Sequence, residues 1–163
     1  MAKKIAYYGS ILSIALIFSF VESLIPFPFL VPGIKLGLAN IIAVFLLYKS
    51  GTRAAFFVNT ARILLAGILF GNAFSIIYSL SGGILSVAAM SFFRRFKALG
   101  PVGVSVIGST AHSIGQIFAA ALVLWTPAVI FYLPVLILIG VFSGILIGIA
   151  AYLILKRLDA AHL

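Results

Sequence analysis

Long apolar stretches, separated by short linkers and flanked at their ends by most of the charged residues, constrain this chain more than any other feature. Of its 163 residues, 64% are hydrophobic and only 8% are charged. A water-soluble domain of this size cannot bury so much apolar surface, so we expect most of the chain to be surrounded by lipid. A helix needs about 20 apolar residues to cross a bilayer. The sequence therefore predicts an all-α integral membrane protein.

We predict a single domain, residues 1–163, that consists of six transmembrane helices. Their predicted bounds are 4–24, 33–49, 53–71, 73–93, 101–125 and 128–155. The linkers are short, so sequential helices should pack as antiparallel neighbours, and we expect no soluble catalytic module. The first stretch resembles a signal peptide, but its apolar run is too long and it offers no small-residue cleavage site.

The basic residues indicate the orientation of these helices. Nine of the eleven fall on one side of the predicted topology: Lys3, Lys4, Lys49, Arg53, Arg94, Arg95, Lys97, Lys156 and Arg157. The opposite linkers, "IPFPFLVPG", "FGN" and "WTP", carry no charge. The positive-inside rule therefore places both termini in the cytoplasm, in a plasma membrane of the bacterial type. The net charge of +9 is explained in this way without a nucleic-acid partner.

The composition also limits the chemistry that the chain can perform. It has no cysteine, which excludes disulfides and thiolate metal sites, and its only acidic residues are Glu22 and Asp159. It has no GxxxxGK[ST] phosphate-binding motif, so any ATP-driven step would need other subunits. We expect no cofactor, no metal site and no enzymatic activity.

Polar residues in the fifth predicted span follow one face of the helix. Ser105, Ser109, His112 and Gln116 recur at steps of four, three and four residues within "GSTAHSIGQ". Polar groups in hydrocarbon need partners, so this stripe should face the interior of the bundle. It serves either to join helices by hydrogen bonds or to form one wall of a binding site, and we favour the binding site.

The third predicted span places an arginine deep in the membrane. Ala55, Asn59, Arg62 and Ala66 form its interior stripe. An arginine at the bilayer centre costs at least about 2.5–3.5 kcal/mol, and neither acidic residue is a good candidate to offset this. Arg62 therefore bonds to Asn59 and backbone carbonyls, or it receives an anion that the protein does not encode. We favour the anion.

The remaining polar residues predict a cavity in the outer half of the bundle. Lys35 and Asn40 begin the second span, Ser79 lies in the fourth, and Glu22 ends the first. Lys35 and Glu22 could equally form a salt bridge at the rim. The predicted substrate-binding residues are Arg62, His112, Gln116, Asn59, Lys35, Asn40, Ser109, Ser79 and Glu22. Such a cavity would be net positive and would suit a small anionic ligand.

Glycines recur in the sixth predicted span. Gly140, Gly144 and Gly148 form a double GxxxG pattern, which lets a neighbouring backbone approach closely. We expect these glycines to pack within the bundle rather than against another subunit.

Several motifs point to one membrane family. "PFLVPGIKLGLANI", "RILLAGILFGN", "SGGILS" and "GSTAHSIGQ" resemble the family labelled heptaprenyl diphosphate synthase component I, also called the Gx transporter family. The six-span size also resembles S components, the substrate-binding subunits of energy-coupling factor (ECF) transporters. This second resemblance implies a bundle of the same kind, with coupling and ATPase subunits as partners beside the membrane lipids.

Two functions remain open at this point. A proton-coupled transporter that works alone is a third, but it would need a carboxylate in the middle of the membrane, and the sequence predicts none there, although His112 could titrate. We favour a substrate-binding membrane subunit for uptake of a small anionic metabolite, related to isoprenoids, quinones or vitamins. The alternative is a non-catalytic accessory protein of prenyl diphosphate or quinone synthesis. Prenyl transfer itself needs magnesium held by clusters of carboxylates, and two acidic residues cannot form them.

Overall fold

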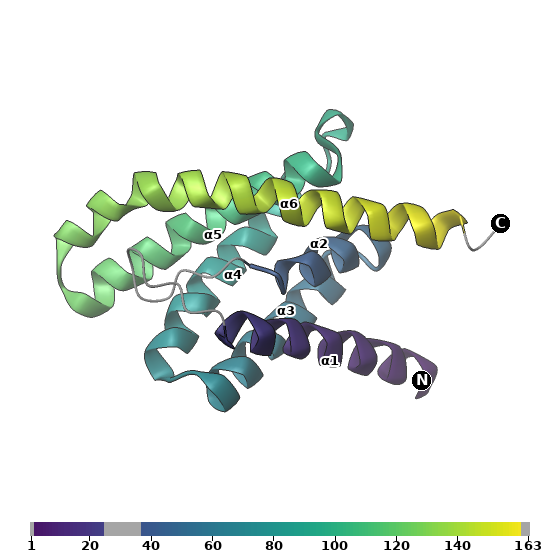
Figure 1. The fold of residues 1–163 in the computed structure, drawn as a ribbon, viewed down its shortest axis with the longest axis horizontal. Helices are drawn as coiled ribbons and strands as arrows, with labels where there is room; N and C mark the ends of the chain where they lie inside the picture. The colour runs from purple at the N-terminus through teal and green to yellow at the C-terminus, as the bar shows by residue number, and fades with distance from the viewer. Residues whose placement is uncertain (1, 25–36, 161–163) are drawn as a thin grey trace.

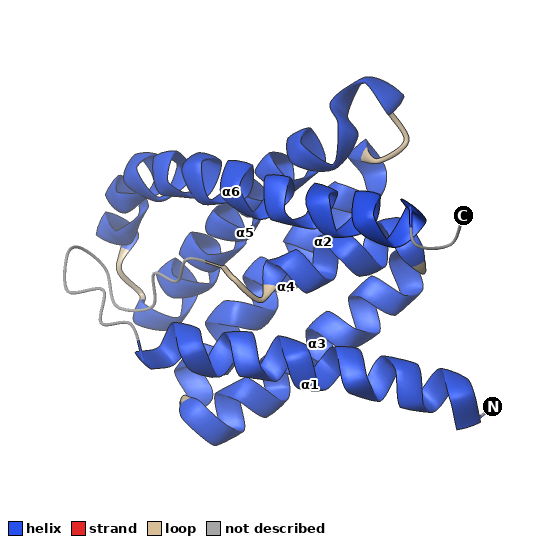
Figure 2. Cartoon of the chain, turned by 45° about the vertical axis from the view of Figure 1, so that its right-hand side comes forward, coloured by secondary structure: helices blue, strands red, loops and turns tan. Residues whose placement is uncertain are grey.

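The computed structural model describes residues 2–24 and 37–160, and these residues form a helical bundle without strands (Figures 1 and 2). Its α-helices are α1 (Ala2–Leu24), α2 (Asn40–Lys49), α3 (Thr52–Phe70), α4 (Ala73–Phe93), α5 (Gly100–Leu124) and α6 (Leu133–Ala160). Two short 3₁₀ helices, η1 (Lys97–Leu99) and η2 (Pro127–Tyr132), lie in the linkers before α5 and α6. The prediction of an all-α membrane protein is confirmed.

Helix α5 packs between α4 and α6, and α3 packs against α1, α2 and α4. Helix α1 lies at the edge of the bundle, where its principal neighbour is α3. The start of α1 and the end of α6 lie at the same end of the bundle (Figure 1). Sequential helices from α2 to α6 pack as neighbours, as predicted, whereas α1 packs mainly against α3 rather than against α2.

Five of the helices are long and apolar enough to cross a membrane, whereas α2 is shorter. The prediction of a helix over 33–49 is wrong at its start, because the helix begins only at Asn40. Gly37 has a φ of +77° and accepts a 2.8 Å hydrogen bond from the Asn40 amide, which makes residues 37–39 a turn. The ten residues of α2 rise only about 15 Å, roughly half the hydrocarbon thickness.

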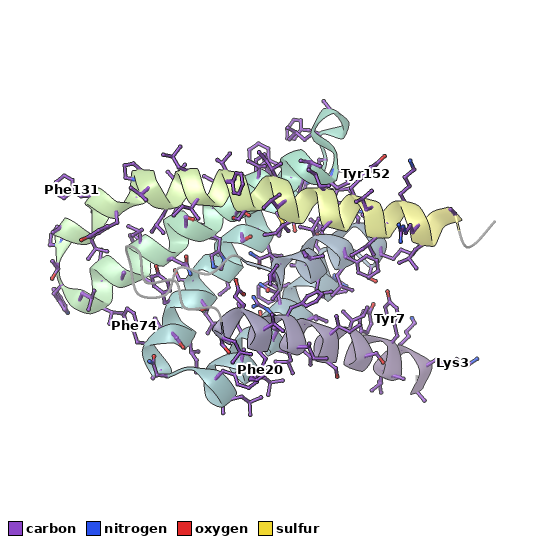
Figure 3. The ribbon with its side chains drawn as sticks, viewed as in Figure 1. Lys3, Tyr7, Phe20, Phe74, Phe131 and Tyr152 are labelled. Carbon is purple, nitrogen blue, oxygen red and sulfur yellow. The ribbon has the colours of Figure 1, made fainter. Side chains whose placement is uncertain are left out.

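The outer surface of the bundle is apolar. Apolar side chains project from it, for example Phe131 of η2 and Tyr152 of α6, with exposed fractions of 86% and 45% (Figure 3). A water-soluble protein rarely exposes apolar surface on this scale. The exposed apolar residues, together with the length of the helices, fit a protein that passes through a membrane several times.

Glycines bring α6 and α5 into backbone contact. A Cβ atom at Gly144 would lie 2.7 Å from the Val106 Cα, and one at Gly148 would lie 2.6 Å from the Val102 Cα. Gly140 faces Ser109 and Ser113 at slightly longer distances. All three glycines thus pack within the bundle, and the close approach fixes the rotation of α5 about its own axis.

Candidate binding site

A polar cavity of about 70 Å³ lies inside the bundle. Its lining comes from the C-terminal ends of α1 and α3, the start of α2, the first halves of α4 and α6, and the middle of α5. The polar lining residues are Ser19, Glu22, Asn40, Arg62, Ser75, Ser79, Ser109, His112, Ser113, Gln116 and Ser143. Residues from all six helices therefore meet at one place, away from the termini.

Arg62 is held by two hydrogen bonds. Its Nη2 donates to the Asn59 Oδ1 at 2.8 Å, and its Nη1 donates to the Ser19 Oγ at 3.3 Å. The buried Nε has no hydrogen-bond partner among the described residues. Asn59 itself does not line the cavity and lies buried behind Arg62. Asn59 and Ser19 thus orient the guanidinium group, which keeps further donor capacity.

Glu22 lies inside the bundle rather than at its rim. Only 4% of its surface is exposed, it lines the cavity with Arg62, and its charge acts favourably on that residue. Its Oε1 accepts a hydrogen bond from the Gly37 amide. The sequence analysis considered Glu22 a poor candidate to offset the Arg62 charge, and the structure instead places the two residues at one cavity. The charged side chains among the described lining residues are one cation and one anion, so the cavity is not strongly positive there.

The polar stripe of α5 faces the cavity over most of its length. Ser109, His112 and Gln116 line the cavity, whereas Ser105 is buried one turn before Ser109 on α5 and does not line it. Ser113 also lines the cavity and donates to the Leu136 carbonyl of α6 at 3.2 Å. Three members of the stripe thus present side chains to the cavity, and the neighbouring Ser113 joins α5 to α6.

Glycines let α4 approach this stripe. A Cβ at Gly82 would lie 2.8 Å from both the His112 carbonyl oxygen and the Gln116 Cγ. At the same crossing, the Ser81 hydroxyl donates a 2.8 Å hydrogen bond to the Gly115 carbonyl. The "SGGILS" motif therefore positions His112 and Gln116 by allowing two backbones to touch.

Helix α4 begins with a capping box next to the cavity. The Asn72 side chain accepts a 2.8 Å hydrogen bond from the Ser75 amide, and the Ser75 hydroxyl receives one from the Asn72 amide. Ser75 and Ser79 line the cavity, but Asn72 does not. Asn72 therefore caps the helix and contributes nothing directly to the site.

The other predicted residues have mixed outcomes. Asn40 lines the cavity from the first turn of α2. Lys35 lies outside the described residues. The sequence analysis did not select Ser19, Ser113 and Ser143 for the site, although all three line the cavity. Single serines are common at helix contacts, so only the i, i+3 spacing of Ser19 and Glu22 could have indicated a role.

The lining of the cavity is rich in hydrogen-bonding side chains. Among the described residues, no cluster of His, Cys, Asp or Glu could hold a metal ion. Each water needs about 10–15 Å³ of such a cavity, so a volume of about 70 Å³ accepts one phosphate-sized group with a few waters. Arginine, imidazole, amide and hydroxyl groups around it are suitable hydrogen-bond donors for such a group.

Comparison with known proteins gives one match. The family profile described as heptaprenyl diphosphate synthase component I matches residues 11–154. No match was found among curated proteins or among solved structures. The matched range includes α2 to α5, most of α1 and α6, and every described residue that lines the cavity. The chain therefore belongs to the heptaprenyl diphosphate synthase component I family.

Proposed function

We propose that the protein is a non-enzymatic membrane component of prenyl diphosphate synthesis, which holds the phosphorylated head group of a lipid substrate. The observation that carries this proposal is Arg62, an arginine deep in an apolar bundle whose guanidinium faces a polar cavity. A guanidinium group binds phosphate oxygens through paired hydrogen bonds, and this interaction is stronger where water is scarce.

The family supports the choice of pathway. Its description names a component of heptaprenyl diphosphate synthase, and a component implies a partner subunit that performs the transfer. The whole sequence has only two acidic residues, which cannot form the carboxylate clusters that hold magnesium in such a reaction. In this proposal the partner supplies the chemistry, and this chain presents the substrate.

The size of the cavity supports a head group as its occupant. A space of about 70 Å³ is far below the roughly 300–1,000 Å³ of pockets that enclose whole ligands. A prenyl chain would therefore remain outside, against the apolar helix surfaces and the lipid. The donors around the head group would be Arg62, Asn40, Ser79, His112 and Gln116.

A second candidate is a substrate-binding subunit for uptake, similar to the S components of ECF transporters. Two observations favour it: the cavity lies in the half of the bundle away from the termini, and the basic residues cluster toward the termini. Under the positive-inside rule the cavity would then face the exterior. Coupling and ATPase subunits would be needed for transport.

Binding and flux measurements separate these candidates. The protein in lipid nanodiscs would be titrated with farnesyl diphosphate and with inorganic pyrophosphate, beside Arg62→Ala and the control Arg53→Ala. Arg53 is exposed at the other end of the same helix. Binding of both probes that only Arg62→Ala abolishes supports a phosphate site.

A clear preference for farnesyl diphosphate, without entry of either probe into proteoliposomes, supports the accessory function. If pyrophosphate instead accumulates inside proteoliposomes that also contain coupling subunits, the uptake function is correct. If neither probe binds to the wild type, both proposals are wrong.

A further inference from the structure

A buried carboxylate shares the cavity with the proposed anion site. Glu22 is 4% exposed, lines the same cavity as Arg62 and interacts with its charge. The Ser19 hydroxyl that receives the Arg62 Nη1 hydrogen bond lies one turn before Glu22 on α1. Any anion that binds to Arg62 therefore enters a space that a carboxylate already borders.

Two like charges in such a space oppose each other strongly. The cavity holds about 70 Å³, which leaves room for only a few waters beside a phosphate-sized group. Few waters mean weak screening, so an anion and an ionised carboxylate that share one buried site favour protonation of the carboxylate. A bound anion and an ionised Glu22 would therefore compete for the Arg62 charge.

We propose that Glu22 is a proton-binding site coupled to ligand binding, so that an anion binds at Arg62 together with one proton taken up by the Glu22 carboxylate. The proton comes from water, and it leaves again when the anion leaves. This inference rests on the proposed anion site. It adds that anion binding at Arg62 and proton binding at Glu22 are thermodynamically linked. Because linkage is reciprocal, protonation of Glu22 must strengthen anion binding by the same factor.

The other elements around the cavity offer one alternative proton acceptor among the described lining residues. Arg62 on α3 already carries its proton, and His112 on α5 is the other titratable side chain among the described lining residues. The described lining residues of α2, α4 and α6 have no titratable side chain: Asn40, Ser75, Ser79, Leu136, Ile139, Gly140 and Ser143. His112 is thus the competitor that the experiment must exclude; Lys35 lies outside the described residues.

The test is calorimetric titration of the detergent-solubilised protein with inorganic pyrophosphate. Measurements at one pH in buffers with different ionisation heats give the number of protons taken up on binding. Wild type, Glu22→Gln and His112→Gln would be compared. Protons that pyrophosphate itself exchanges are common to all three variants and cancel in the differences.

The expected result is that Glu22→Gln takes up about one proton fewer than wild type on binding. The affinity of wild type should change by up to about tenfold more per pH unit than that of Glu22→Gln. His112→Gln should bind pyrophosphate more weakly but take up as many protons per bound pyrophosphate as wild type does. Equal uptake by wild type and Glu22→Gln would overturn the proton linkage while leaving the anion site intact. Loss of proton uptake in His112→Gln alone would assign the proton to His112 and would also overturn the proposed linkage at Glu22. Absence of binding in wild type would contradict the anion site itself.

Infrared difference spectroscopy provides a second test that needs no change at Glu22. The sequence has only two acidic residues, Glu22 and Asp159, so an Asp159→Asn variant has one side-chain carboxyl group. Addition of pyrophosphate to this variant should produce the C=O stretching band of a protonated carboxylic acid. Binding without that band would refute the proposal, even if Glu22→Gln failed to fold.

Discussion

The Arg62 Nη2 donates a 2.8 Å hydrogen bond to the Asn59 Oδ1, one turn earlier on the same helix. This contact orients the guanidinium group toward a cavity that residues of all six helices line. Asn59 is buried and does not line the cavity itself, so its role is to position Arg62. The pair explains why two strongly polar residues occur at this spacing in an otherwise apolar helix.

His112→Ala should weaken pyrophosphate binding by at least about tenfold, because one hydrogen bond to a charged group contributes about 1.5–3 kcal/mol. His112 lines the cavity, whereas Ile114 is 42% exposed on the same helix. Ile114→Ala is therefore the matched control and should bind as wild type does. Equilibrium binding would be measured on protein that elutes as a single species. Unchanged affinity of His112→Ala would remove this residue from the site.

Gly144→Ala should destabilise the bundle by about 1–3 kcal/mol, as overpacking typically does. The added Cβ would lie 2.7 Å from the Val106 Cα, and a backbone atom cannot move aside as a side chain does. Gly9→Ala provides the control, since nothing lies within 4 Å of its Cβ position. The measurement is the thermal unfolding midpoint in detergent. Equal midpoints for the two variants would contradict the close contact between α5 and α6.

Asn72→Ala should destabilise the start of α4 by about 1 kcal/mol, the usual effect of losing an N-cap. Asn72 and Ser75 form a reciprocal capping box, and Asn72→Asp preserves the acceptor. Hydrogen exchange of the amides in the first turn of α4 would report the change. Faster exchange is expected in Asn72→Ala and near wild-type exchange in Asn72→Asp. If both variants exchange alike, the side-chain cap does not stabilise this turn.

Single cysteines can test the orientation, because the natural sequence has none. The linker residue Ser50 follows α2, and Thr126 lies between α5 and η2 at the opposite end of the bundle. Under the positive-inside rule, Thr126→Cys should react with a membrane-impermeant maleimide in intact bacterial cells. Ser50→Cys should react only after permeabilisation. The reverse pattern would place the cavity in the cytoplasmic half.

The sequence predicted the long helices well because their limits depend on local signals. Apolar runs and charged linkers alone located α3, α4 and α5 to within a few residues. The start of α2 was missed because "PGIKLGLAN" is apolar enough to continue a span. The turn depends on the positive φ of Gly37 and its hydrogen bond from the Asn40 amide, and apolar composition does not report either.

The site was predictable where it depended on one helix at a time. Helical spacing put Ser109, His112 and Gln116 on one face, and the structure places all three at the cavity. The position of Glu22 was not predictable in this way. Whether a residue near the end of α1 faces solvent or Arg62 depends on how α1 is rotated against α3, and that rotation is set by contacts between helices.

The most direct test of the central claim is native mass spectrometry of gently purified wild type beside Arg62→Ala. The claim is that the Arg62 cavity binds the phosphorylated head group of a ligand from the membrane. We expect wild type to retain a phosphorylated small molecule that Arg62→Ala lacks, with both proteins intact and monodisperse. If both samples are free of ligand, or if both retain the same molecule, Arg62 does not form an anion site and the account is contradicted.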